Sequence, residues 1–255
     1  STSNTYTGAT TVTGGELIAD SPRAIPATSA LSIGSGAMVQ LASTIGPVSL
    51  ASLAVSGGGT LDITNNMVTL TYSGHDPIAS IASALATGYA GGNWNGGGID
   101  SSAVASLQAS QGKLIYAIGY SDGADGILPT LSSGQIEILP TLAGDAKLEG
   151  IVVFGDFQIM AEYFGKSVGW DEGNFTYGST VDFGDFQSLA QNFGQTASAL
   201  SSGEFASLNS FAAQFGDTLV ANPGGGFSVV AVPEPAAVGL VMASLGLLAR
   251  RRRRR

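Results

Sequence analysis

The chain contains no cysteine, which excludes disulfides, thiolate metal sites and cysteine nucleophiles. Charged residues are also scarce, at 11%, and histidine occurs only once. Glycine is abundant instead, with 37 residues among 255. This balance is unusual for a cytoplasmic enzyme and is typical of extracellular β-proteins that are rich in glycine, serine and threonine.

Basic residues are few and unevenly distributed. Six of the ten lysines and arginines form the C-terminal run Arg250–Arg255. Residues 1–249 therefore carry four basic and nineteen acidic residues, a formal charge of −15. A body with this charge does not bind nucleic acid through its electrostatic field, although it can attract cations. The chain begins without Met and without a signal peptide, so we expect a processed form or the C-terminal part of a longer protein.

The C-terminus has three successive parts. A Val-Pro-Glu-Pro box precedes the uncharged apolar run Ala236–Ala249, which the arginines follow. As a helix the run would be about 21 Å long, less than the ~30 Å hydrocarbon core of a bilayer. Arginine side chains extend such a span and keep the basic end on the cytoplasmic side. The prolines favour an extended, protease-accessible segment.

This arrangement resembles the PEP-CTERM sorting signal of certain Gram-negative bacteria and planctomycetes. The resemblance implies export to the cell envelope, transient anchoring in the inner membrane and cleavage by an exosortase-like membrane protease. The alternative is an ordinary single-span anchor that is never cut. The residues implied in recognition and cleavage are Val232, Pro233, Glu234 and Pro235, and those implied in stopping transfer are Arg250, Arg251, Arg252, Arg253, Arg254 and Arg255.

Residues 1–73 have the alternating apolar and small polar pattern of β-strands. A weak repeat of about 21–23 residues brings back Gly15, Gly36 and Gly59 after short β-like runs, as in the rungs of a β-helix. The segment Asn4–Leu17 resembles the autotransporter-associated β-strand repeat. That resemblance implies a right-handed parallel β-solenoid in a secreted or surface protein.

Residues 74–140 form a mixed, glycine-rich region. We expect helices over Pro77–Ala90 and Ser101–Ser110, and strands over Leu114–Tyr120 and Gln135–Leu139. Trp94, between two asparagines, is a candidate for stacking on sugar, although packing in the core is the favoured interpretation.

Residues 141–217 contain a repeat with an offset of 29 residues. Phe154–Gly165 and Phe183–Gly194 both place apolar side chains at i, i+3, i+4 and i+7, on one helical face, and both end in glycine. Leu208, Phe211 and Phe215 give a similar face a third time. We therefore expect three short helices that pack through their Phe faces.

A twelve-residue loop precedes each of the first two helices, over Asp145–Asp156 and Asn174–Asp185. Calcium loops of this length take side-chain ligands at positions 1, 3, 5, 9 and 12 and a carbonyl ligand at position 7. Loops and helices together resemble a degenerate type I dockerin module in its planctomycete form. The resemblance implies Ca²⁺ ligands at Asp145, Glu149, Ile151 (carbonyl), Asp156, Asn174, Thr176, Thr180 (carbonyl), Asp182 and Asp185.

Both loops depart from that pattern. Lys147 places a cation at position 3 of the first loop, Val153 offers no ligand at position 9, and Gly178 stands at position 5 of the second loop. The alternative is that the loops keep the fold without a metal, with Asp156 and Asp185 acting as helix-start carboxylates. The resemblance also implies a cohesin-like protein or a surface polysaccharide as partner.

We therefore predict a mainly β fold with a small α module, in which an N-terminal β-solenoid leads to dockerin-like helical repeats and a C-terminal hydrophobic helix. The predicted divisions are 1–73 (solenoid), 74–140 (mixed region), 141–217 (dockerin-like module), 218–232 (linker) and 233–255 (sorting tail).

The predicted function is that of a non-catalytic, exported structural or adhesive protein of the cell surface or extracellular matrix. His75, which precedes Asp76, is interpreted as a turn residue rather than as part of a catalytic triad, and we predict no enzyme. Two alternatives stay open. One is a carbohydrate-associated component of a polysaccharide-degrading assembly, and the other is a hydrolase, which would need a cleft with paired carboxylates.

Overall fold

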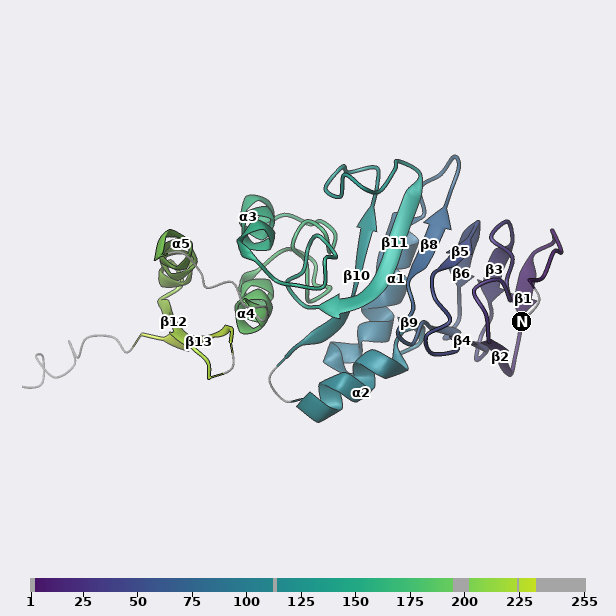
Figure 1. Ribbon diagram of the computed structural model, residues 1–255, viewed down its shortest axis with the longest axis horizontal. Helices are drawn as coiled ribbons and strands as arrows, with labels where there is room; N and C mark the ends of the chain where they lie inside the picture. Colours follow the sequence, from purple (N-terminus) through teal and green to yellow (C-terminus); the bar gives the residue numbers. More distant parts are fainter. Residues whose placement is uncertain (1–2, 112–113, 195–201, 224, 233–255) are drawn as a thin grey trace, which may run out of the picture.

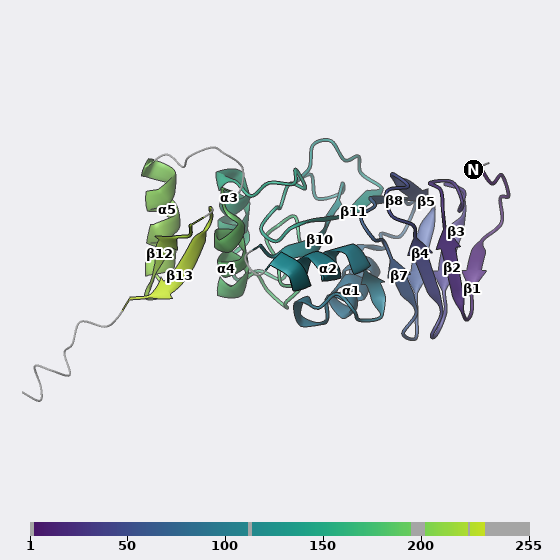
Figure 2. The same cartoon turned by 60° about the horizontal axis from the view of Figure 1, so that its bottom comes forward.

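The computed structural model describes residues 3–111, 114–194, 202–223 and 225–232. Its elements follow one another along the long axis of the molecule in nearly the order of the chain (Figures 1 and 2). Parallel strands lie at the N-terminal end, a mixed sheet with two helices lies in the middle, and short helices with a hairpin lie at the other end.

Two sheets of the described part are entirely parallel. Most neighbouring strands in these sheets pair at intervals of 21 or 22 residues, for example Leu31 with Leu53 and Val39 with Leu61, and these four side chains are buried. The weak glycine repeat of the sequence coincides with this spacing. The first sheet contains β1 (Thr10–Val12), β3 (Ala30–Ile33) and β6 (Ser52–Val55), and the second contains β2 (Glu16–Ala19), β4 (Met38–Leu41), β7 (Thr60–Asp62) and β9 (Gly98–Asp100).

A third sheet joins the parallel strands to the rest of the fold. β8 (Val68–Thr71) pairs in parallel with β5 (Val48–Leu50) on one side and antiparallel with β11 (Gln135–Leu142) on the other. β11 in turn pairs antiparallel with β10 (Tyr116–Asp122). The direction of pairing therefore changes at β8.

The prediction of a mainly β fold that begins with a β-solenoid is wrong. The structure is a mixed α/β fold in which helices pack on the strands of parallel sheets. The last strand of the second sheet, β9, enters only after helix α1 (Ile78–Tyr89), and α1 packs directly on it. Repeat spacing indicates which strands are neighbours, but it does not tell whether the chain between them forms a turn or a helix.

Helix α1 confirms the expected helix over 77–90 and shows how its ends are set. The Asp76 carboxylate accepts a hydrogen bond from the Ile78 amide (2.8 Å), and the helix ends at Ala90, which has a left-handed backbone (φ 45°). A short 3₁₀ turn (Ala90–Gly92) follows. Helix α2 (Ser102–Gln111) and strands β10 and β11 likewise match their expected positions within a few residues.

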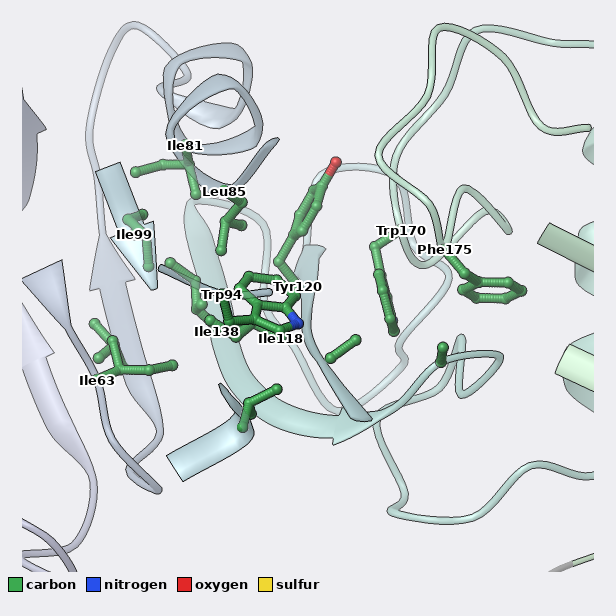
Figure 3. Packing of buried hydrophobic residues seen from close by; sticks show 14 of the residues in the cluster. Ile63, Ile81, Leu85, Trp94, Ile99, Ile118, Tyr120, Ile138, Trp170 and Phe175 are labelled. Atoms are coloured by element: carbon green, nitrogen blue, oxygen red, sulfur yellow. The ribbon is translucent and has the colours of Figure 1, made fainter. Parts of the chain in front are cut away.

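Glycines allow α1 to approach β9 unusually closely. A Cβ atom on Gly88 would lie 1.8 Å from the Ile99 carbonyl oxygen, and one on Gly98 would lie 2.3 Å from the Ala84 carbonyl oxygen. Trp94 lies in the loop between helix and strand and is only 1% exposed, which confirms core packing as its role (Figure 3). Its ring packs against those of Tyr89 and Tyr177.

The C-terminal part contains α3 (Phe154–Tyr163), α4 (Phe183–Asn192) and α5 (Ser202–Ala213). As expected, they pack through their aromatic faces, and Phe211 contacts Phe157, Phe164 and Phe186 with ring centroids 4.8–5.5 Å apart. Residues 218–232 were expected to form a linker. Instead, β12 (Asp217–Ala221) and β13 (Phe227–Ala231) form an antiparallel hairpin there.

Within the described ranges, no helix is long and apolar enough to cross a bilayer. The predicted C-terminal hydrophobic helix falls in residues 233–255, which lie outside those ranges.

A row of polar side chains crosses the second sheet. Gln40, Asp62 and Asp100 occupy matching register positions on β4, β7 and β9. Asp62 accepts hydrogen bonds from the Gln40 amide (2.9 Å) and from the backbone amides of Thr64 and Ser102. Asp100, in contrast, has a buried carboxylate oxygen without a hydrogen-bond partner in the described part. Burial, together with the charge of Asp62, raises the pKa of Asp100 to about 7.

We expect Asp100→Asn to stabilise the protein at pH 8 by about 1–2 kcal/mol and to have little effect at pH 4. One pKa unit corresponds to ~1.4 kcal/mol, and partial exposure of the site reduces the full value. Because the folded state holds the proton more tightly than the unfolded state, native stability falls as pH rises from about 4 to about 7, and asparagine removes that loss. Urea unfolding at both pH values measures the difference. The exposed Asp20→Asn is the control, and an equal gain from it at pH 8 would contradict the assignment.

Candidate functional site

The two dockerin-like loops have the same internal hydrogen bonds, 29 residues apart. At position 1, Asp145 accepts from the amide of Glu149 (3.0 Å), and Asn174 accepts from the amide of Gly178 (2.9 Å). Asp145 also accepts from the Gly150 amide and from the Thr141 hydroxyl. The position-1 side chain thus holds the turn of its own loop in both repeats.

The side chain at position 12 also accepts hydrogen bonds from backbone amides of its own loop in both repeats. Asp156 accepts from the amides of Lys147 (3.2 Å) and Val153 (2.9 Å). Asp185 accepts from the amides of Thr176 (2.8 Å) and Asp182 (2.7 Å), and also from the Thr176 hydroxyl. Both carboxylates cap the start of the following helix. Asp156 and Asp185 therefore have the helix-start role that the sequence offered for them, and this role does not decide whether the loops bind calcium.

Burial shapes the electrostatics of these loops. Asp145, Asp156 and Asp185 are fully buried, and desolvation raises the pKa of each, to about 6 for Asp156. Hydrogen bonds from backbone amides oppose that effect in all three. In the first loop Lys147 lies near Asp156 and lowers its pKa, while its ammonium pairs with Glu149 at 3.4 Å.

The first loop does not fit a calcium ion. Position 3 holds Lys147, whose ammonium forms an ion pair with the would-be ligand Glu149. Position 9 holds the apolar Val153. In the second loop the Thr176 hydroxyl donates to Asp185, and Asp182 is an exposed helix cap. Within the described part, neither loop gathers three acidic ligand atoms, and Ile151 and Thr180 are half-buried. Calcium at the second loop stays a prediction.

Each loop packs against the helix of the other repeat. A Cβ atom on Gly144 would lie 2.7 Å from the Cα of Leu189 in α4, and one on Gly173 would lie 2.7 Å from the Cα of Met160 in α3. Both glycines have positive φ angles. The repeats therefore form one unit with a local twofold arrangement.

Long-range hydrogen bonds fix this unit to the α/β body. The Tyr177 hydroxyl donates to the Ile118 carbonyl on β10, while the Trp170 indole donates to the Asp145 carbonyl (2.9 Å) within the repeats. Asn192, at the end of α4, accepts from the Ile115 amide and donates to the carbonyls of Ile115 and Ala143. Buried apolar residues of body and repeats belong to one continuous core, and Figure 3 shows Tyr120 and Trp170 where the two meet.

An acidic cluster lies at this junction, where Asp125 of the turn Asp122–Gly126, a turn that the sequence also offers as a calcium turn, meets two residues that the sequence did not connect with it. Ligand oxygens of Asp125, Asp171 and Glu172 all lie within 4.8 Å of one another. Asp125 belongs to the β10–β11 loop, within the turn Asp122–Gly126. Asp171 and Glu172 precede the second dockerin-like loop. Burial and the like charges of Asp125 and Glu172 raise the pKa of Asp171 to about 8.

Ser121 lies beside this cluster and carries a signal that the sequence analysis missed. Gly119–Gly123 reads G-x-S-x-G, the pattern of a nucleophile elbow. An elbow needs an exposed serine at a strand-to-helix turn, whereas Ser121 is fully buried within β10, and the turn that follows leads to strand β11. The pattern therefore does not indicate a nucleophile here.

Of the predicted sorting residues, only Val232 is described. It is exposed, and its amide donates to the Gly216 carbonyl (2.9 Å) at the start of the hairpin. Pro233, Glu234, Pro235 and Arg250–Arg255 lie outside the described residues. No protein-family model, curated protein or solved structure matches this chain.

Proposed function

We propose that this chain is a non-catalytic structural component of a bacterial cell surface or extracellular matrix, sorted there through residues 232–255. The observation that carries the proposal is that the polar side chains of the helical repeats are engaged within the fold. The side chains at loop positions 1 and 12 hold backbone amides, and Tyr177 and Asn192 fix the repeats to the α/β body. The repeats thus serve as part of one rigid fold.

The aromatic faces of the repeats support the same view. Phe157 and Phe186 are buried against Phe211 of α5, so these faces are occupied within the chain. A docking module that recruits a partner through them would have to open its own core. Binding of a cohesin-like protein or of a surface polysaccharide at micromolar affinity would instead favour a carbohydrate-associated role.

Sorting is tested by reading the mature C-terminus. We expect protein recovered from a host with an exosortase-like enzyme to lack Ala236–Arg255, with the cut at or next to the Pro-Glu-Pro box. Val232 is exposed at the end of the hairpin, and the two prolines favour extended backbone that suits a protease groove. Mass spectrometry of the intact protein gives the end point.

The matched variant replaces Pro233 and Pro235 with alanine and should stay uncut. A second variant with all six arginines replaced by serine should release more uncut precursor, because it lacks the basic stop. An intact Arg255 on wild-type protein at the cell surface would contradict the sorting proposal.

A further inference from the structure

The junction between the α/β body and the helical repeats contains acidic side chains from two distant parts of the chain. Asp125 comes from the β10–β11 loop, and Asp171 and Glu172 come from the segment between α3 and α4. Asp171 is 2% exposed, Glu172 is half-buried and Asp125 is exposed. The cluster therefore has a closed inner side and an open outer side.

Backbone amides hold the three carboxylates in place. The Ile127 amide donates to Asp125 (2.9 Å), the Asp122 amide to Asp171 (3.3 Å) and the Gly169 amide to Glu172 (3.1 Å). Each of these bonds engages one oxygen of its carboxylate, and the Asp171 carboxyl also interacts with the side chains of Ser121 and Asp125. In the part of the chain that the structure describes, no lysine or arginine forms a salt bridge with the cluster. The salt bridge that is present, Lys147–Glu149, lies in the first dockerin-like loop.

A second observation points to a missing partner at the inner side. The Ser121 side chain is completely buried, and its hydroxyl has no hydrogen-bond partner of ordinary geometry among the described residues. The same hydroxyl faces the Asp171 carboxylate closely enough to stabilise its charged form. Leaving a buried hydroxyl without a partner costs free energy, so a ligand that accepts its lone pair would resolve the arrangement.

We propose that Asp125, Asp171, Glu172 and the Ser121 hydroxyl form a binding site for a divalent, oxygen-preferring cation, with calcium as the expected ion. Carboxylate and hydroxyl oxygens are hard ligands, and calcium accepts six to eight of them in irregular geometry, with water completing the shell. The open side at Asp125 admits the ion and its remaining waters. The bound ion would clamp the β10–β11 loop of the body to the helical repeats.

This site is distinct from the dockerin-like loops, whose predicted ligands lie elsewhere in the repeats. A test must therefore separate the two. We would titrate the full chain with CaCl₂ by calorimetry and repeat the titration on Asp125→Asn/Glu172→Gln. Both replaced side chains are at least partly exposed, so the variant keeps the buried Asp171 and the fold. We expect the calcium affinity of this variant to fall at least tenfold.

The matched control is Glu149→Gln/Asp182→Asn. It also removes one glutamate and one aspartate charge, but from exposed side chains of the dockerin-like loops. It should bind calcium like the wild type. Ser121→Ala, which removes only the hydroxyl, should weaken binding a few-fold and tests the buried ligand without changing charge. Tb³⁺ gives a local readout, because Trp170 and Tyr120 lie next to Asp171 and should sensitise its luminescence.

The expected result is Tb³⁺ emission that calcium displaces and that Asp125→Asn/Glu172→Gln loses. Absence of calcium binding by the wild type at millimolar concentration would overturn the proposal. So would calcium binding that survives Asp125→Asn/Glu172→Gln and disappears in Glu149→Gln/Asp182→Asn, since the ion would then belong to the loops.

Discussion

Gly88→Ala is expected to destabilise the protein by about 3 kcal/mol or more, because overpacking at a rigid contact forces elements apart. The added Cβ would lie 1.8 Å from the Ile99 carbonyl oxygen and 2.6 Å from its carbon, both of which belong to the backbone of β9. Helix α1 would have to move away from the sheet, and the neighbouring contact of Gly98 with Ala84 would open with it. Chemical denaturation followed by circular dichroism measures the loss.

Gly14→Ala provides the control for this prediction. Gly14 is exposed, has an ordinary backbone conformation and has open space where its Cβ would lie. We expect a change within about 0.5 kcal/mol. If Gly88→Ala is equally well tolerated, the close approach of α1 to β9 is not a feature of the folded protein.

Asn192→Ala is expected to cost about 3 kcal/mol. The Asn192 side chain is fully buried and bonds to the amide and carbonyl of Ile115 and to the Ala143 carbonyl at 2.7–3.0 Å. Alanine would remove all three hydrogen bonds and leave the partly buried Ile115 amide without this partner, and each unsatisfied buried group costs about 1–3 kcal/mol. The effect should appear as a lower unfolding midpoint in urea.

The exposed Gln187→Ala on the same helix is the matched control and should change stability by less than about 0.5 kcal/mol. Hydrogen exchange adds a local test. In Asn192→Ala, amides of β10 and of the helical repeats should lose protection together, because the side chain joins them. Loss confined to the last turn of α4 would show that Asn192 does not couple the two parts.

The sequence predicted elements whose signals are local. Asp76 and Pro77 mark the start of α1, and Gly165 and Gly194 follow the repeated helices, so these positions agreed with the structure. Packing was predictable where periodicity alone decides it, as for the Phe faces around Phe211.

The architecture and the acidic cluster depend on distant contacts and were not predictable. Nothing near β7 in the sequence shows that β9, 36 residues further along, completes its sheet. Asp125 and Asp171 are 46 residues apart, and only the docking of the repeats on the body brings them together. Asn192 illustrates the same limit, because a helix-end asparagine carries no sign of the strand that it joins.

The hairpin of β12 and β13 has a mechanical consequence for a chain that is held at its C-terminus. Ala231 pairs with Asp217, so the pulled end of β13 lies beside the start of β12. A force on Val232 would therefore open the ladder one pair at a time, as a zipper opens, beginning with the bond to Gly216. Unzipping needs far less force than shearing many hydrogen bonds at once. The hairpin would yield first under tension and extend, while the aromatic cluster and the parallel sheets behind it stayed folded.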